Sequence, residues 1–391
     1  MIYFLVLAYT LILVFKYDIT GQKRGFKANY YILLVTVCCV SGVSYRLGMD
    51  TVGYMVFYKS VDPDTSYVIK HLSEYRYEPV FMIFLSLCKS ISDDFTIVQF
   101  LITIFVNSTI FWFLRKHSPL FFVAILFYFV MQFWNINFEI KRESITISLF
   151  LIAIDGLLKS NASKREYIRY YLICSFMLLC HRFAFVTFFY PLFTKIKLNK
   201  TSLSILVFLC FLSIANIKFA TSLFSKINIL SSFVDVQGAV TYYMQSDKYG
   251  NGGASIFGVL TSIFIPLFML YKTERYINSK VVGMTICYLL IQILTTQVFI
   301  LYRFSNYLCF FVFILFSYFT KYAFKQRLKI NRFVYLSTVV FIFLLTVKGK
   351  FNKDQYIRYY PYTSVFDKKY NQDRESEYYK LSDGDSSNIG F

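Results

Sequence analysis

The chain has 391 residues, of which 57% are hydrophobic, 21% are aromatic and only 16% are charged. This balance nearly excludes a soluble globular enzyme and also excludes extensive disorder, because disordered chains combine low hydrophobicity with high charge. The formal net charge of +19 would indicate a nucleic-acid partner in a soluble protein, but the basic residues here lie in short segments between apolar runs, so no nucleic-acid partner is expected.

The first apolar run covers residues 1–15 and is predicted to be a retained membrane span with its N-terminus outside. It lacks the basic start and the small-residue cleavage site of a signal peptide. The first basic residues, Lys16, Lys23, Arg24 and Lys27, follow the run instead of preceding it.

The eight cysteines are scattered through apolar runs without the spacing that a zinc site needs. They are predicted to be reduced and to serve as small buried hydrophobic residues. No metal and no cofactor are expected.

Apolar runs near the roughly 20 residues needed to cross a bilayer recur along the chain. They lie at about 1–15, 29–45, 95–114, 118–136, 144–158, 201–220, 254–271, 281–301, 304–320 and 333–347. Two further segments, 79–91 and 170–193, are ambiguous, since the first is short and the second has His181 and Arg182 near its middle. Either is expected to be a re-entrant or broken helix. The sequence thus predicts an all-α polytopic integral membrane helix bundle with about 10–12 spans.

The distribution of basic residues predicts the orientation of the spans. The short loops 16–28, 115–117, 159–169, 195–200, 272–280 and 321–332 hold 21 of the 41 Lys and Arg residues. These loops are therefore expected in the cytoplasm, which requires 170–194 to enter and leave the membrane on the same side.

Residues 1–347 are predicted to form one polytopic membrane domain with outer loops at about 46–94 and 221–253. The turn 136–143 falls on the same outer side. Residues 348–391 are expected to be an extracytoplasmic tail with a disordered last part.

The stretch from Arg46 to Tyr54 lies just outside the second predicted span and contains Asp50. Glu78 and Pro79 follow at the entrance to the next apolar segment. A cation, two carboxylates and aromatic rings are thus predicted at one membrane interface, as expected of a binding or catalytic site. The alternative is an ordinary solvated loop with an interfacial anchor.

The stretch from Glu139 to Glu143 separates two apolar runs and contains Lys141 and Arg142. Arg142 falls at a helix N-terminus, where the macrodipole favours an anion. An anionic ligand would satisfy both the helix end and the guanidinium. The alternative is that these charges are snorkelling helix ends.

Two further arginines fall near apolar runs. Arg182 follows His181 inside an apolar run, where such residues usually face a cavity, although the pair can also mark a wet turn between two half-helices. Arg303 is the only charge between residues 281 and 320, and Tyr302 and Phe304 flank it. It is expected at a hairpin tip on the outer face, where the alternative is an aromatic interfacial belt.

The topology brings Arg46, Arg142, Arg303 and Arg182 to or near one face. Guanidinium groups bind phosphate oxygens bidentately, so several converging arginines suggest a diphosphate ligand. Tyr and Phe side chains nearby offer flat faces to sugar rings and to an isoprenoid chain.

In these residues the chain resembles the EpsG family of bacterial exopolysaccharide polymerases, which are of the same kind as Wzy-type O-antigen polymerases. The resemblance rests on Arg46 to Tyr54, Glu78-Pro79, Arg142, His181 and the Tyr302-Arg303-Phe304 turn, in this order, and on Tyr359 to Phe366 in the tail. The chain departs from the family pattern at Glu143, where glutamine is common, and at Arg182.

The resemblance implies a metal-independent transfer of a glycan from undecaprenyl diphosphate onto another lipid-linked repeat unit, at the outer face of the bacterial cytoplasmic membrane. Arg142 and Arg303 are then expected to clamp the diphosphate, with Arg46 in support. Asp50 is the first choice for the base or acceptor contact, followed by His181 and Glu78. The remaining residues expected to bind the substrate are Arg182, Tyr54 and Tyr302.

Family analogy also implies several partners: the lipid-linked oligosaccharide, membrane lipid, a chain-length regulator and a flippase. Two other functions stay open. A lipid-linked oligosaccharide flippase would also need arginines in a polar cavity, but it predicts charges along both halves of a pathway. A membrane O-acyltransferase would need a histidine, such as His181, reached by acyl-CoA from the cytoplasm.

Overall fold

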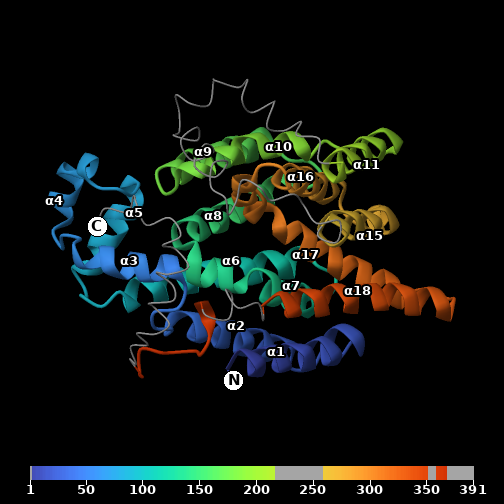
Figure 1. Cartoon of the computed structure of the whole chain (residues 1–391), viewed down its shortest axis with the longest axis horizontal. Helices are drawn as coiled ribbons and strands as arrows, with labels where there is room; N and C mark the ends of the chain where they lie inside the picture. Colours follow the sequence, from blue (N-terminus) through green and yellow to red (C-terminus); the bar gives the residue numbers. More distant parts are fainter. Residues whose placement is uncertain (1, 216–258, 351–357, 368–391) are drawn as a thin grey trace.

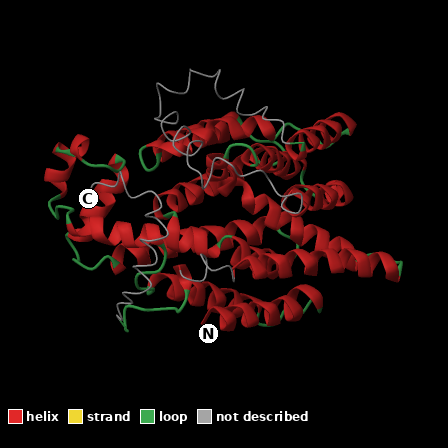
Figure 2. Ribbon diagram, in the orientation of Figure 1, coloured by secondary structure: helices red, strands yellow, loops and turns green. Residues whose placement is uncertain are grey.

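The computed structural model describes residues 2–215, 259–350 and 358–367. These residues form helices joined by short loops, with no extended strand among them (Figure 2). The all-α prediction is therefore confirmed. The α-helices are α1 (Ile2–Leu13), α2 (Phe26–Gly42), α3 (Met49–Lys59), α4 (Thr65–Lys70), α5 (Pro79–Lys89), α6 (Thr96–His117), α7 (Phe121–Met131), α8 (Lys141–Leu157), α9 (Lys164–Leu178), α10 (Tyr190–Phe193), α11 (Lys200–Ile214), α15 (Ile265–Thr273), α16 (Ser279–Thr295), α17 (Tyr302–Phe324) and α18 (Lys329–Lys350).

Four helical segments of the described chain are long and apolar enough to cross a membrane: Ile2–Ile19, Thr96–His117, Tyr302–Phe324 and Lys329–Lys348. Shorter apolar helices lie at Phe26–Gly42, Pro79–Lys89, Phe121–Met131, Arg182–Phe193, Lys200–Ser213 and Ser279–Thr295. The chain is thus a multi-pass membrane protein, as predicted. The division into one domain and a tail stays a prediction, although α18 ends at Lys350, beyond the predicted boundary at 347.

The long helices run side by side and give the bundle two distinct ends (Figure 1). One end carries α3, α4, α5 and the segment 358–367, and we call it the α3 end. We call the opposite end the basic end, because it holds the Lys- and Arg-rich loops. There the Nζ of Lys280 donates to the carbonyl of Leu157 over 2.8 Å, and the Nζ of Lys116 lies 2.7 Å from Asp155.

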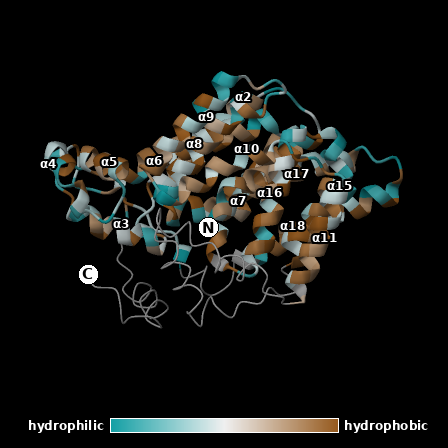
Figure 3. Ribbon diagram, turned by 90° about the horizontal axis from the view of Figure 1, so that it is seen from above, coloured by the Kyte–Doolittle hydropathy of each residue, from teal (hydrophilic) through white to brown (hydrophobic). Residues whose placement is uncertain are grey.

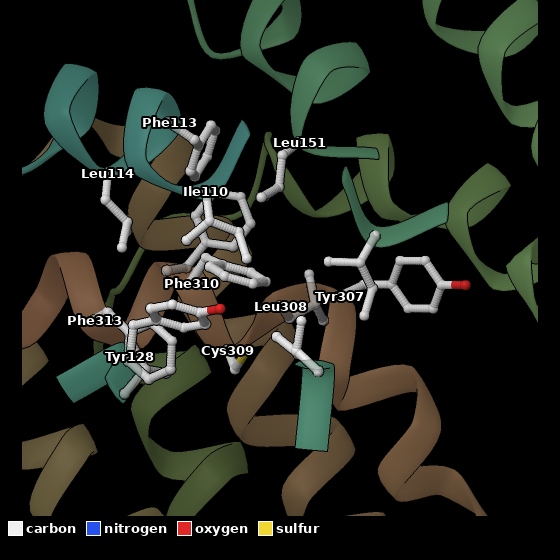
Figure 4. Packing of buried hydrophobic residues seen from close by; sticks show 14 of the residues in the cluster. Ile110, Phe113, Leu114, Tyr128, Leu151, Tyr307, Leu308, Cys309, Phe310 and Phe313 are labelled. Atoms are coloured by element: carbon white, nitrogen blue, oxygen red, sulfur yellow. The ribbon is translucent and has the colours of Figure 1, made fainter. Parts of the chain in front are cut away.

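Helix α17 is the central helix of the bundle. In its apolar window 78% of the residues are buried, whereas the corresponding value for α18 is only 6%, so α18 lies at the periphery. Aromatic side chains fill the interior: Tyr128 of α7 packs against Phe310 and Phe313 of α17 (Figure 4). Lipid tails are as apolar as these side chains, so close packing, more than transfer from water, holds the helices together. The hydropathy of the outer helix surfaces agrees with this placement, because long brown stretches cover α11 and α18 (Figure 3).

The predicted broken segment at 170–194 is a helical hairpin with both ends at the basic end. Helix α9 begins with a capping box between Ser163 and Glu166 and stops at Leu178. The chain then turns and returns as a 3₁₀-helix, η4 (Arg182–Phe189), followed by α10. The tip of this hairpin reaches the α3 end, where the backbone N–H of Val80 donates to the carbonyl of Leu179 over 3.0 Å.

The loop predicted at 221–253 lies outside the described residues, as do residues 368–391 of the tail. The part of the tail from 358 to 367 is described and lies at the α3 end.

Candidate functional site

Helices α3, α8 and α17 begin at the α3 end, and each has a charged side chain at its second position. Helix α3 carries Asp50 there, α8 carries Arg142 and α17 carries Arg303. The starts of α8 and α17 lie side by side, since the Nδ2 of Asn306 donates to the Oε1 of Glu143 over 2.8 Å. None of the three helix ends has a side-chain cap from its N-cap residue. Their N-terminal dipoles therefore add at one place, which favours a bound anion.

Arg142 is held in one orientation by two partners. Its Nη1 pairs with the Oε2 of Glu78, and its Nε donates to the hydroxyl of Tyr54 over 3.1 Å. The guanidinium also lies 4.3 Å from the ring centroid of Tyr77, which is cation–π range. Nη2 makes no hydrogen bond within the described part of the chain, so one edge of the fork remains for a ligand.

Glu78 precedes α5 and connects this helix with α8 and with the hairpin tip. Burial alone would raise the pKa of its carboxyl, but His181 and Arg142 beside it outweigh burial and lower the pKa to about 2. A carboxylate of such low basicity holds a proton poorly at neutral pH. The geometry thus favours Glu78 as the group that positions Arg142 over its predicted role as a base.

His181 lies at the tip of the hairpin, between two carboxylates. Its Nδ1 is 3.7 Å from the Oε1 of Glu78, and its Nε2 is 3.8 Å from the Oε2 of Glu143. Both distances exceed a hydrogen bond, and the side chain is only 6% exposed. The imidazole is thus buried between the carboxyl groups of Glu78 and Glu143.

Arg182 follows His181 and joins the site through its backbone. Its N–H donates to the Oε1 of Glu78 over 3.2 Å, while its side chain is exposed. The pair thus lies at the turn between the two halves of the hairpin, with the His181 side chain buried and the Arg182 side chain exposed.

Arg303 lies in the first turn of α17, as expected for a hairpin tip. Its guanidinium carbon is 4.9 Å from the ring centroid of Phe183, which places the cation over the aromatic face. Tyr302 is half-buried, and its carbonyl accepts a hydrogen bond from Ser305 over 2.6 Å.

Asp50 is the most accessible of the predicted carboxylates. Its side chain is open to solvent, yet the protein around it still desolvates the carboxyl and raises its pKa. Arg303, Arg358 and Arg142 oppose this rise, in that order. With Arg76, which acts in the same direction, the carboxylate lies within the electrostatic reach of four guanidinium groups.

Gly48 lets the start of α3 approach the residues before α8. Its φ of 84° belongs to glycine, and a Cβ here would lie 2.2 Å from the carbonyl oxygen of Phe138. That carbonyl also accepts a hydrogen bond from Thr51. Arg46, two residues earlier, is half-buried and has a positive φ of 51°. The predicted Arg46–Tyr54 stretch is thus built around close backbone contact.

Replacing Gly48 with alanine is expected to destabilise the protein by more than about 3 kcal/mol, because strain and a backbone clash add. Thermal unfolding of the purified protein measures the loss. Gly53→Ala is the matched control, since a Cβ at Gly53 meets nothing within 4 Å, and this change should stabilise α3 by about 0.5–1 kcal/mol. Equal unfolding temperatures for the two variants would contradict the assignment.

Three charged residues of the site were not among the predicted site residues. Glu139 accepts from the backbone N–H of Asp50 over 3.0 Å and from the hydroxyl of Tyr359 over 3.1 Å. Arg358 lies 3.6 Å from the same carboxylate, and Glu143 binds Asn306. The charged run 139–143 was a sequence signal for both glutamates. For Arg358 the sequence signal was only that it precedes the Tyr359–Phe366 stretch.

A buried polar ring supports the segment that carries Glu139. The hydroxyl of Tyr128 donates to Asn107 over 2.7 Å, Asn107 donates to Asn137 over 2.8 Å, and Asn137 donates back to Tyr128 over 2.9 Å. The Nζ of Lys141, fully buried, donates to the carbonyl of Asn137. Such closed networks fix a single arrangement of the backbone.

The described residues contain no group of three His, Cys, Asp or Glu side chains that could hold a metal ion. Catalysis without a metal stays a prediction. What the site does offer is a set of oriented cations, an accessible carboxylate and three helix N-termini, which suits a reaction that develops negative charge on an anionic leaving group.

Comparison with curated proteins and with solved structures found no match. Comparison with protein-family models found one over residues 27–364, which is most of the chain and includes every residue described at the site. This protein therefore belongs to the EpsG family.

Proposed function

We propose that the protein transfers a glycan chain from undecaprenyl diphosphate onto another lipid-linked repeat unit, at the outer face of the bacterial cytoplasmic membrane. Membership of the EpsG family supports a polysaccharide polymerase in general. The proposal of a diphosphate substrate rests on one observation: Arg142 and Arg303 both lie in the first turns of two adjoining helices.

The arginines would stabilise the diphosphate as it leaves. When the bond between the anomeric carbon and the diphosphate oxygen breaks, its electron pair stays on the diphosphate and adds negative charge. Nη2 of Arg142, the guanidinium of Arg303 and the helix N-termini are in place before the reaction, so little reorganisation is needed. Arg46 would support this clamp as a cation four residues before Asp50, just ahead of α3.

Asp50 would accept the proton of the acceptor hydroxyl. As that oxygen attacks the anomeric carbon, its proton moves to the carboxylate, and the glycosidic bond forms while the diphosphate leaves. The raised pKa of Asp50 makes it a stronger base than an ordinary aspartate, and its accessibility suits contact with a sugar. His181 and Glu78 are buried and serve to position the arginine and the hairpin tip.

The distribution of basic loops supports an outer-face location for this chemistry. Loops rich in Lys and Arg gather at the basic end, opposite the site, and such loops are retained in the cytoplasm. The α3 end would then face outward in the bacterial inner membrane, where a flippase delivers lipid-linked units and a chain-length regulator acts on the product.

The decisive experiment is gel analysis of surface and lipid-linked glycan in a strain that lacks this protein but still makes repeat units. Loss of polymer, with single units at the outer face, is the expected result. Single units held at the cytoplasmic face would instead identify a flippase. Full-length polymer without one substituent would identify an O-acyltransferase acting through His181.

A further inference from the structure

The segment 358–367, which we call the C-terminal strap, is tied by backbone hydrogen bonds to the residues that join α2 to α3. The N–H of Tyr45 donates to the carbonyl of Thr363 over 2.9 Å, and the N–H of Val365 donates to Val43 over 2.9 Å. The N–H of Gly48 donates to the carbonyl of Arg358 over 3.1 Å. The strap is therefore held in place by its main chain, independently of the Arg358 side chain.

The Arg358 side chain lies beside Glu139, the glutamate that also contacts the start of α3. Its Nη1 lies 3.6 Å from the Oε1 of Glu139, which is an ion-pair distance but longer than a hydrogen bond. Glu139 is itself fixed, because it accepts hydrogen bonds from the backbone N–H of Asp50 and from the hydroxyl of Tyr359. The carboxylate is thus already satisfied by neutral donors, and the Arg358 side chain is 29% exposed.

This pair repeats the arrangement seen at Arg142. There, buried Glu78 orients a guanidinium, and here buried Glu139 does so. Arg142, Arg358 and Arg303 all lie close enough to the carboxylate of Asp50 to lower its pKa. A diphosphate has two phosphoryl groups, and several forks bind it better than one.

We infer that Arg358 is a third binding residue for the diphosphate of the lipid-linked substrate and that Glu139 is its positioning residue. The inference rests on the proposed function for the identity of the anion. It makes the C-terminal strap part of the site, so that residues from α3, α8, α17 and the strap contribute to one anion-binding surface.

The test measures binding of undecaprenyl diphosphate to the purified full-length protein in nanodiscs. Arg358→Gln is expected to weaken binding about 10–100-fold, as loss of a charged donor does, with an unchanged unfolding temperature. Arg358→Lys should recover part of the affinity through its charge. Arg358→Gln should weaken the binding of undecaprenyl monophosphate less than it weakens the binding of undecaprenyl diphosphate. Phe366→Ala is the control within the strap, because that side chain is 85% exposed, and it should bind like the wild type.

A second variant separates binding from support of the fold. If Glu139 acts through Arg358, Glu139→Gln should weaken binding, and the double variant should bind no more weakly than Arg358→Gln alone. Wild-type affinity in Arg358→Gln would overturn the inference, as would a wild-type protein that does not bind the diphosphate. If binding depends on Arg358 but the deletion strain still makes full-length polymer, the inference stands and the proposed function fails.

Discussion

Replacing Arg303 with lysine is expected to reduce polymer synthesis by about 100–1,000-fold, the usual effect of losing a preorganised donor to a developing anion. Lysine keeps the charge but loses the planar fork and the contact with the Phe183 ring. The same change at Arg142 retains an ion pair with Glu78 but loses the bond to Tyr54 and the second fork edge. Surface glycan length on gels and the transfer rate with lipid-linked units measure both effects.

Two controls show whether the fork itself is responsible. Tyr54→Phe removes one neutral partner of Arg142 and should slow transfer by only about 10-fold, in line with a single hydrogen bond. Arg169→Lys changes an exposed arginine of α9 near the basic end and should leave glycan length unchanged. Full-length glycan in stably expressed Arg303→Lys and Arg142→Lys strains would rule out the clamp.

The membrane helices could be predicted because an apolar run of sufficient length has few alternatives to a span. The run at 95–114 corresponds to α6 (Thr96–His117), and the run at 304–320 corresponds to α17 (Tyr302–Phe324). Both helices extend beyond their apolar runs because polar end residues such as Arg115 and Lys116 snorkel away from the hydrocarbon. The break after Leu178 was also indicated, because His181 and Arg182 interrupt the apolar run just beyond it.

The sequence indicated which residues approach the site but not which ones pair. Asp50, Glu78 and Arg142 were predicted at one interface because each lies next to the end of an apolar run. The pairing of Arg142 with Glu78, 64 positions apart, and of Glu139 with Asp50, 89 positions apart, depends on how the helices pack. Arg358 could not be predicted either, because the backbone hydrogen bonds of the strap bring it to the start of α3.

The pairing also explains why so many charges can lie together here. A buried ion without a partner costs several kcal/mol, and the site lowers this cost by placing a buried glutamate beside Arg142 and beside Arg358. Glu78 faces Arg142, Glu139 faces Arg358, and Glu143 lies beside His181. Asp50 differs, because its carboxylate is accessible and is engaged only through the field of the arginines.

This difference makes Asp50 the residue whose loss we expect to be most specific to chemistry. Asp50→Asn should lower the transfer rate by about 100–10,000-fold, the range of a general base, while binding of undecaprenyl diphosphate is retained because no cation is lost. A base must be ionised, and the pKa of Asp50 is raised. The wild-type rate should therefore fall with acidification at a pH above the ordinary aspartate value of about 3.9. Asp50→Glu should keep this fall of the rate at acidic pH, which we call the acid limb, and Asp50→Asn should lack it.

The matched control is Asp93→Asn, a carboxylate in the loop before α6 whose side chain is 92% exposed and pairs with Lys89. It should transfer glycan at the wild-type rate with the wild-type pH profile, because a surface ion pair contributes little. If Asp50→Asn transfers at the wild-type rate, or if its residual rate keeps the acid limb, the proton goes elsewhere. His181 would then be the next group to replace, since it was the second choice for this role and lies between Glu78 and Glu143.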